Sequence, residues 1–273
     1  MKLQTQVKRA WCPGCGNYAI LSAFISAVKE LKIEPEKLVV VSGIGCHGRI
    51  TDYVNVNSFH TIHGRVLPLA TGIKIANPEL IVVGFSGDGD AYSIGLGHLP
   101  HAARRNVDIT LVIHNNQVFG LTTGQYTPTS PKGFKSRSTP YGSLEEPLNP
   151  VLLAIASGAT FVARGFAGDI NHLKYLMKEA ITHKGFAIID VLQPCVTYYN
   201  TYQYYSERVY KLENHDSTNF REALEKALEW NDKIPIGIFY KVQKPLAYRQ
   251  ARIAPAHRTE FNIDVTKLYS RFR

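Results

Sequence analysis

Polar residues that suit a hard cation and a phosphate ester follow two short apolar runs of the sequence. Gly87-Asp88-Gly89-Asp90 comes directly after residues 81–86 (IVVGFS), and Asn115-Asn116 comes directly after residues 109–114 (ITLVIH). Mg²⁺ takes oxygen ligands and usually only one or two carboxylates, so Asp88 and the Asn116 amide are candidate ligands. Glycines beside Asp88 let backbone N–H groups approach phosphate oxygens. For GDG alone, a simple tight turn is an equally good interpretation.

The elements that must position these residues are two strands and the segment that joins them. Both apolar runs are β-branched and uncharged, as strands buried on both faces are. Residues 94–105 have room for a helix, so the region predicts a strand, a helix and a parallel strand. Both polar ends then lie at the carboxyl edge of one sheet, where open α/β sheets bind ligands.

The rest of the chain repeats this alternation. We expect further strands at residues 38–41, 160–164 and 186–192, and helices at 17–31, 67–77, 151–157, 172–183 and 220–230. Five strands interleaved with helices predict an α/β fold, a doubly wound, mostly parallel sheet with helices on both faces. Residues 234–242 suggest one more short strand. Residues 127–150 form a long loop rich in Pro, Ser, Thr and Gly, which we expect to cover the site or contact a partner.

Four cysteines form a second candidate site. Cys12 and Cys15 stand in a C-x-x-C turn held by Pro-Gly, whereas Cys46 and Cys195 each follow a predicted strand. Four thiols at one sheet edge can converge on a metal. Zinc and iron–sulfur clusters both accept four thiolates, so the spacing leaves the two open.

Composition and charge indicate how the chain is divided into regions. The 273 residues are 45% hydrophobic, which is ample for a core, and the formal net charge is +9. Residues 231–273 carry nine Lys and Arg against three Asp and Glu, so +6 of that charge lies in the tail. We divide the chain into an α/β domain at 1–230 and a basic C-terminal extension at 231–273, either an arm that contacts another subunit or a disordered end.

The same features exclude several classes of partner and location. A basic surface attracts polyanions, but the sequence has no nucleic-acid-binding motif, so we expect no nucleic acid. There is no apolar run long enough for a membrane helix, and MKLQTQVKRAW lacks the apolar segment of a signal peptide. We therefore expect no membrane contact and a cytoplasmic location.

Six sequence blocks in order, WCPGCGN, GIGCHGR, IHGRVLPLATGIKIANP, GDGD, NNQVFGLTTGQ and QPC, resemble the β subunit of 2-oxoacid:ferredoxin oxidoreductases over most of residues 10–201. GDG followed by NN is similar to the diphosphate-binding signature of thiamine-diphosphate enzymes. The resemblance implies that Asp88, Asn116 and the carbonyl of Val118 bind Mg²⁺. It also implies a [4Fe-4S] cluster rather than zinc, held by Cys12, Cys15, Cys46 and Cys195.

The resemblance also implies which residues contact thiamine diphosphate. They are Ile44, Gly45, Cys46, His47, His63, Gly64, Gly89, Asp90, Gly120 and Leu121. His63 taken alone is more typical of a satisfied loop histidine. Arg49 is a weaker candidate: its guanidinium either pairs with the carboxylate of a 2-oxoacid or is a surface charge.

The implied function is coenzyme A-dependent oxidative decarboxylation of 2-oxoacids to acyl-CoA and CO₂, with electrons passed through the cluster to ferredoxin. Thiamine enzymes need a second α/β domain for the aminopyrimidine ring, with an activating Glu, and no such domain fits after residue 192. We therefore expect an α subunit to carry it. Two alternatives remain: a non-redox thiamine-diphosphate-dependent decarboxylase or synthase subunit, and a basic zinc-bound binding module without catalysis.

Overall fold

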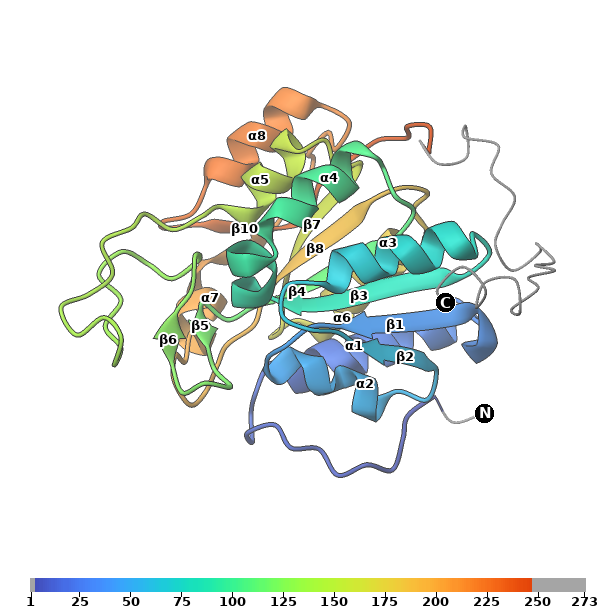
Figure 1. Cartoon of the computed structure of the whole chain (residues 1–273). Helices are drawn as coiled ribbons and strands as arrows, with labels where there is room; N and C mark the ends of the chain where they lie inside the picture. The colour runs from blue at the N-terminus through green and yellow to red at the C-terminus, as the bar shows by residue number, and fades with distance from the viewer. Residues whose placement is uncertain (1–2, 247–273) are drawn as a thin grey trace, which may run out of the picture.

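The computed structural model describes residues 3–246, and its centre is an eight-stranded sheet with the order β2-β1-β3-β4-β8-β7-β10-β9 (Figure 1). The strands are β1 (Leu38–Ser42), β2 (Asn57–His60), β3 (Ile81–Gly87), β4 (Thr110–Asn115), β7 (Phe161–Phe166), β8 (Ala187–Leu192), β9 (Val209–Lys211) and β10 (Ile234–Lys241). A separate hairpin pairs β5 (Val118–Phe119) with β6 (Gln125–Tyr126).

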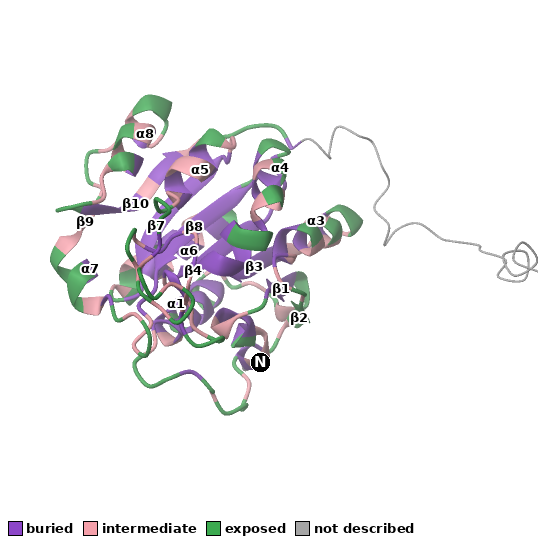
Figure 2. Cartoon of the chain, turned by 60° about the vertical axis from the view of Figure 1, so that its left-hand side comes forward, coloured by how far each residue is buried: buried purple, intermediate pink, exposed green. Residues whose placement is uncertain are grey.

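The five strands predicted from the sequence form the middle of this sheet. β1, β3, β4, β8 and β7 pair in parallel in that order, and their side chains are buried almost throughout. Figure 2 shows these strands in purple between helices whose outer sides are exposed. Side chains that point to both faces meet a packed core, which is why these segments are continuous apolar runs rather than alternating ones.

Helices cover both faces, as predicted for a doubly wound sheet. α1 (Asn17–Glu30) and α6 (Ile170–Thr182) pack with α2 (Ile50–Tyr53) into one apolar core. On the other face α3 (Val66–Ala76), α4 (Leu99–Arg104), α5 (Pro150–Ala156) and α8 (Phe220–Leu228) share a second core (Figure 1). A short helix, α7 (Tyr202–Arg208), follows β8. Within residues 3–246, none of the helices combines the length and apolarity that a membrane crossing needs.

The connection between β3 and β4 is less regular than predicted. Instead of one helix over 94–105, the chain makes a π-helical turn at Asp90–Ile94, a 3-10 turn at Leu96–His98 and then the short α4. Gly95 gives the reason, because a Cβ there would lie 2.5 Å from the Asp90 carbonyl and 3.1 Å from the Cα of Gly64. The backbone at Gly95 packs against the backbone at Gly64, which leaves no room for the side chains of a regular helix.

Two strands of this sheet, β2 and β9, and the β5-β6 hairpin were missed by the sequence analysis, whereas the strand predicted at 234–242 is β10. β2 is an edge strand whose four residues are all exposed, so it carries no apolar pattern, and β9 has only three residues. β10 lies antiparallel to β7 and parallel to β9. The sheet therefore continues past residue 230, where we placed the end of the α/β domain. Most of the predicted arm toward another subunit lies outside the described residues.

Candidate functional site

A cavity of about 1020 Å³ lies at the carboxyl ends of β1, β3 and β4. Nearly all of the predicted cofactor and magnesium residues line it, namely Ile44, Gly45, Cys46, His47, His63, Asp88, Gly89, Asp90, Asn116, Val118, Gly120 and Leu121. Gly64 does not line the cavity, but its N–H donates to the Asp90 carboxylate, 2.7 Å away. Parallel pairing brings these strand ends to one edge, so residues 77 positions apart in the chain, such as 44 and 121, share one cavity.

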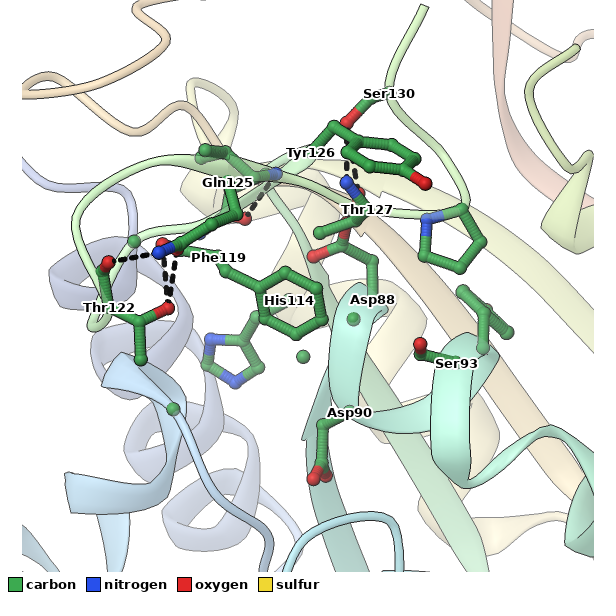
Figure 3. Close-up of a pocket in the computed structure, with 18 of the residues that line it drawn as sticks. Asp88, Asp90, Ser93, His114, Phe119, Thr122, Gln125, Tyr126, Thr127 and Ser130 are labelled. Carbon is green, nitrogen blue, oxygen red and sulfur yellow. Dashed lines mark hydrogen bonds between the residues drawn. The ribbon is translucent and has the colours of Figure 1, made fainter. Parts of the chain in front are cut away.

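Asp88 is a buried carboxylate held by neutral donors. Its Oδ2 accepts hydrogen bonds from the hydroxyls of Thr127, at 2.6 Å, and Thr129, at 2.7 Å, and the side chain is only 2% exposed. Burial raises the pKa of Asp88, while these hydroxyls and the backbone N–H of Asn116 lower it in part. Figure 3 shows Asp88 and Thr127 side by side at the cavity. A buried carboxylate next to Asn116 with only neutral partners suits a bound cation.

Asp90, two residues after Asp88, holds a second group of cavity residues in place. Its Oδ1 lies 2.7 Å from the Nδ1 of His63 and accepts the Gly64 N–H, and its Oδ2 accepts the Ser86 hydroxyl. Burial by itself raises the pKa of Asp90, but the nearby His47 imidazole, whose Nε2 lies 3.6 Å from Oδ2, together with these donors holds it below its usual value. Asp90 is thus an ionised anchor that orients two imidazoles.

His47 and His114 both line the cavity and are both buried. The His47 ring fits between glycines, because a Cβ at Gly45 or Gly87 would lie 2.8 Å from it. The Nδ1 of His114 lies 2.7 Å from the Oδ1 of Asn17, and burial lowers the pKa of His114 well below its usual value. The sequence analysis missed His114, although its place at the end of a predicted strand was a usable signal.

Four buried polar atoms of the cavity wall have no hydrogen-bond partner within the described chain: His47 Nε2, Tyr92 Oη, His114 Nε2 and Gln193 Oε1. Buried polar groups in proteins are nearly always satisfied. Unpaired donors and acceptors around one cavity therefore fit a polar ligand such as a diphosphate cofactor.

The long loop that the sequence singled out forms one side of the cavity. Residues Thr127, Pro128, Ser130, Ser143, Glu145, Glu146 and Leu148 line it. Sequence reasoning identified the loop but not its two threonines on Asp88, because nothing in a Pro- and Ser-rich segment indicates which hydroxyl turns inward. Gln117 secures the loop by donating to the Thr129 carbonyl, 2.8 Å away.

The four cysteines approach one another at the margin of this cavity, and none forms a disulfide. A Cβ at Gly120 would lie 3.6 Å from the Cys195 sulfur and 3.7 Å from the Cys46 sulfur. Burial, and to a smaller extent the other three thiols, raises the pKa of Cys15 to about 12. Mutual repulsion of this kind suits thiols that a metal cluster deprotonates. As residues 3–246 are placed, however, no three His, Cys, Asp or Glu side chains hold a ready-made metal site.

Arg49 does not line the cavity. Its Nε lies 3.4 Å from the Oδ2 of Asp52, and both side chains are largely exposed. This geometry matches the surface-charge interpretation, and the carboxylate contact stays a prediction.

The sequence and the fold are similar to those of known proteins. Residues 43–191, more than half of the chain, match the family model of the thiamine pyrophosphate enzymes' C-terminal TPP-binding domain. Residues 195–254 match the model of the C-terminal part of the pyruvate ferredoxin oxidoreductase beta chain. The thiamine-diphosphate-binding fold predicted from the sequence is therefore confirmed.

Individual relatives agree. The chain is 50% identical to the 2-oxoacid:ferredoxin oxidoreductase subunit beta of Saccharolobus solfataricus, over 89% of this chain and 85% of that one. It is 45% identical to the 2-oxoglutarate synthase subunit KorB of Archaeoglobus fulgidus, over 85% of this chain and 84% of that one. A solved 2-oxoglutarate:ferredoxin oxidoreductase from Magnetococcus marinus, with 2-oxoglutarate, coenzyme A and succinyl-CoA bound, matches with a TM-score of 0.90 and 39% identity, over 99% of this chain and 94% of that one. The chain therefore belongs to the β subunits of the 2-oxoacid:ferredoxin oxidoreductases, an enzyme family.

Proposed function

We propose that this subunit binds thiamine diphosphate through Mg²⁺ held by Asp88, Asn116 and the Val118 carbonyl. The observation that carries the proposal is the buried Asp88 carboxylate, which receives hydrogen bonds only from neutral groups and lies within hydrogen-bonding reach of the Asn116 backbone. Such a carboxylate is stabilised when a cation occupies the space in front of it. The unpaired polar atoms around the cavity then meet the cofactor.

We further propose that Cys12, Cys15, Cys46 and Cys195 hold a [4Fe-4S] cluster. The sulfurs of Cys46 and Cys195 both lie close to Gly120, which lines the cofactor cavity, and this proximity supports the assignment. A cluster there would lie next to the bound cofactor and relay single electrons.

The reaction proposed is oxidative decarboxylation of a 2-oxoacid, with transfer of the acyl group to coenzyme A and of electrons to ferredoxin. Thiamine diphosphate, when bound, supplies the nucleophilic carbon and stabilises the charge left after CO₂ departs. The chain's own residues supply orientation and shielding. Asp90 holds His63 and His47 in place, and the loop at residues 127–148 covers the cavity and limits the access of water.

The proposed complex includes an α subunit with the aminopyrimidine-binding domain and the activating Glu, and a ferredoxin acceptor, in the cytoplasm. The subunit names of the relatives support an α partner. The 2-oxoglutarate and coenzyme A in the Magnetococcus marinus structure support those substrate classes. Arg49 is retained as a candidate contact of the substrate carboxylate.

Metal analysis and a visible spectrum of anaerobically purified complex test the proposal. We expect about four iron atoms per β subunit, a brown chromophore and Mg²⁺-dependent binding of thiamine diphosphate. A colourless, iron-free protein that binds thiamine diphosphate would favour the non-redox alternative, which the names of the relatives do not support. Bound zinc without thiamine affinity would favour the binding module. The β subunit purified without its partner is expected to show no decarboxylase activity, and full activity would refute the α-subunit requirement.

A further inference from the structure

A second cavity of about 180 Å³ lies behind the loop that forms one side of the cofactor cavity. Neighbouring residues of one loop segment line different spaces: Thr127, Pro128 and Ser130 line the large cavity, whereas Thr129 and Pro131 line the small one. Leu148 lines both. The loop is therefore a thin wall between the cofactor cavity and a separate space, to which no role has been assigned so far.

The charged group of this small cavity is Arg164, a fully buried residue of β7. Its guanidinium stacks over the rings of Trp230, at 4.8 Å, and Phe239, at 5.2 Å. Stacking covers the face of the guanidinium, so ligands are confined to its edges. Along one edge Nη1 donates a long hydrogen bond to the Pro235 carbonyl, at 3.4 Å.

The opposite edge of Arg164 has no hydrogen-bond partner within the described chain, since neither Nε nor Nη2 has one. These two N–H groups lie side by side and form the fork that binds a carboxylate through two parallel hydrogen bonds. A buried charged donor without a partner is strongly destabilising, so an occupant that brings acceptor oxygens is favoured.

Asp190 is the acidic neighbour of Arg164, but it does not satisfy this edge. Its Oδ2 lies 3.8 Å from Nε, beyond hydrogen-bond distance, and both of its oxygens accept from the Asn115 amide, at 3.0 and 3.3 Å. Burial raises the pKa of Asp190 to about 6. Because both Asp190 oxygens accept from the Asn115 amide, the Nε and Nη2 edge of Arg164 is left for an added anion.

We propose that the small cavity binds a carboxylate-type oxyanion, such as formate or bicarbonate, on the Nε and Nη2 edge of Arg164. The volume of about 180 Å³ favours a small acid, and prolines at 131, 147 and 150 form part of the lining. The same chemistry comes from two sources: a free small carboxylate, or bicarbonate formed from released CO₂. Only the second source rests on the proposed decarboxylation.

Occupation of this cavity is connected to the proposed magnesium site through three hydrogen-bonded side chains. The Asn115 amide donates to Asp190, and the single hydroxyl proton of Thr129 is shared between the Oδ1 of Asn115, at 3.1 Å, and the Oδ2 of Asp88, at 2.7 Å. An anion that draws Arg164 away from Asp190 would change the hydrogen bonds of Asn115 and Thr129, and Thr129 is a partner of Asp88. The second cavity is thus placed to sense or tune the cofactor site.

The test is saturable binding of sodium formate and sodium bicarbonate to the complex without thiamine diphosphate, measured by calorimetry against sodium chloride at equal ionic strength. The variant is Arg164→Lys, which keeps the charge but loses the fork. Arg208→Lys is the matched control, because Arg208 also stacks on an aromatic ring, that of Tyr204, but its side chain is 32% exposed and lies outside the small cavity. We expect binding to the unaltered protein, at least a tenfold weaker affinity in Arg164→Lys and no change in Arg208→Lys.

Crystals soaked in formate give a second readout that does not depend on whether Arg164→Lys folds. Planar density paired with Nε and Nη2 supports the site, and water alone on that edge overturns it, as does an unchanged affinity in Arg164→Lys. A preference for bicarbonate over formate identifies the product-derived source, and the reverse identifies free carboxylates. Since the assay needs no turnover, its failure is distinct from failure of the proposed reaction.

Discussion

Gly43→Ala tests whether the anchored Asp90 carboxylate holds the cofactor cavity together. A Cβ at Gly43 would lie 1.9 Å from the Oδ2 of Asp90 and 2.9 Å from its Oδ1. Both distances are far inside van der Waals contact, so the carboxylate must move. Gly43 does not need a positive φ, so the added methyl acts by this clash and not by backbone strain.

The expected loss follows from the bonds that Asp90 makes. Its buried donors include the Gly64 N–H and the Ser86 hydroxyl. Hydrogen bonds to a charged group contribute roughly 1.5–3 kcal/mol each, so loss of both lowers the free energy of unfolding by about 3–6 kcal/mol. Because a typical domain has only about 5–15 kcal/mol in total, the variant is expected to be close to unfolding at 37 °C.

Urea unfolding of the purified complex measures this loss, with thiamine diphosphate affinity as a second readout. Gly72→Ala is the control, because Gly72 lies inside α3 and a Cβ there meets nothing within 4 Å. That substitution is expected to leave affinity unchanged and to stabilise by up to about 1 kcal/mol. Gly43→Ala with unaltered stability and unaltered affinity would show that Asp90 does not anchor the site.

Four further substitutions test separate parts of the site and fold. Asp88→Ala is expected to weaken Mg²⁺-dependent binding of thiamine diphosphate on the order of 100-fold or more while iron content stays constant, and retained affinity would refute the magnesium assignment. Cys46→Ala is expected to lose iron but keep its far-ultraviolet circular dichroism; an intact cluster would show that the ligand set is wrong. Arg49→Met tests the predicted substrate contact: loss of a bidentate pair raises the KM for the 2-oxoacid by about tenfold with little effect on affinity for the cofactor, and an unchanged KM assigns Arg49 to the surface. Burial lowers the pKa of His183 from 6.5 to about 4. Between these pH values His183 is protonated in the unfolded chain but not in the folded one, so the free energy of unfolding falls as the pH falls from 6.5 to 4. His183→Gln is expected to show a smaller fall between those pH values in denaturant titrations, and an identical pH profile would contradict this reasoning.

Much of the sheet could be predicted because its central strands are buried on both faces and therefore read as unbroken apolar runs. β2 could not, since an exposed edge strand has no apolar pattern and depends on β1 for its pairing. The helix predicted at 94–105 was wrong in form, because the close approach of Gly95 to Gly64 is a tertiary contact that no local pattern records.

The sequence by itself determined the residue types at the strand ends. An acid and an amide follow two neighbouring strands, two cysteines stand in a tight turn, and each of the other two cysteines follows a strand. Those follow from local chemistry and from the rule that parallel strands end at one edge. Only the tertiary structure decided which distant groups meet them. Thr129 reaches Asp88 from 41 residues away, and Arg164 faces the small cavity beside Trp230, because packing, not spacing along the chain, sets which side chains share a buried space.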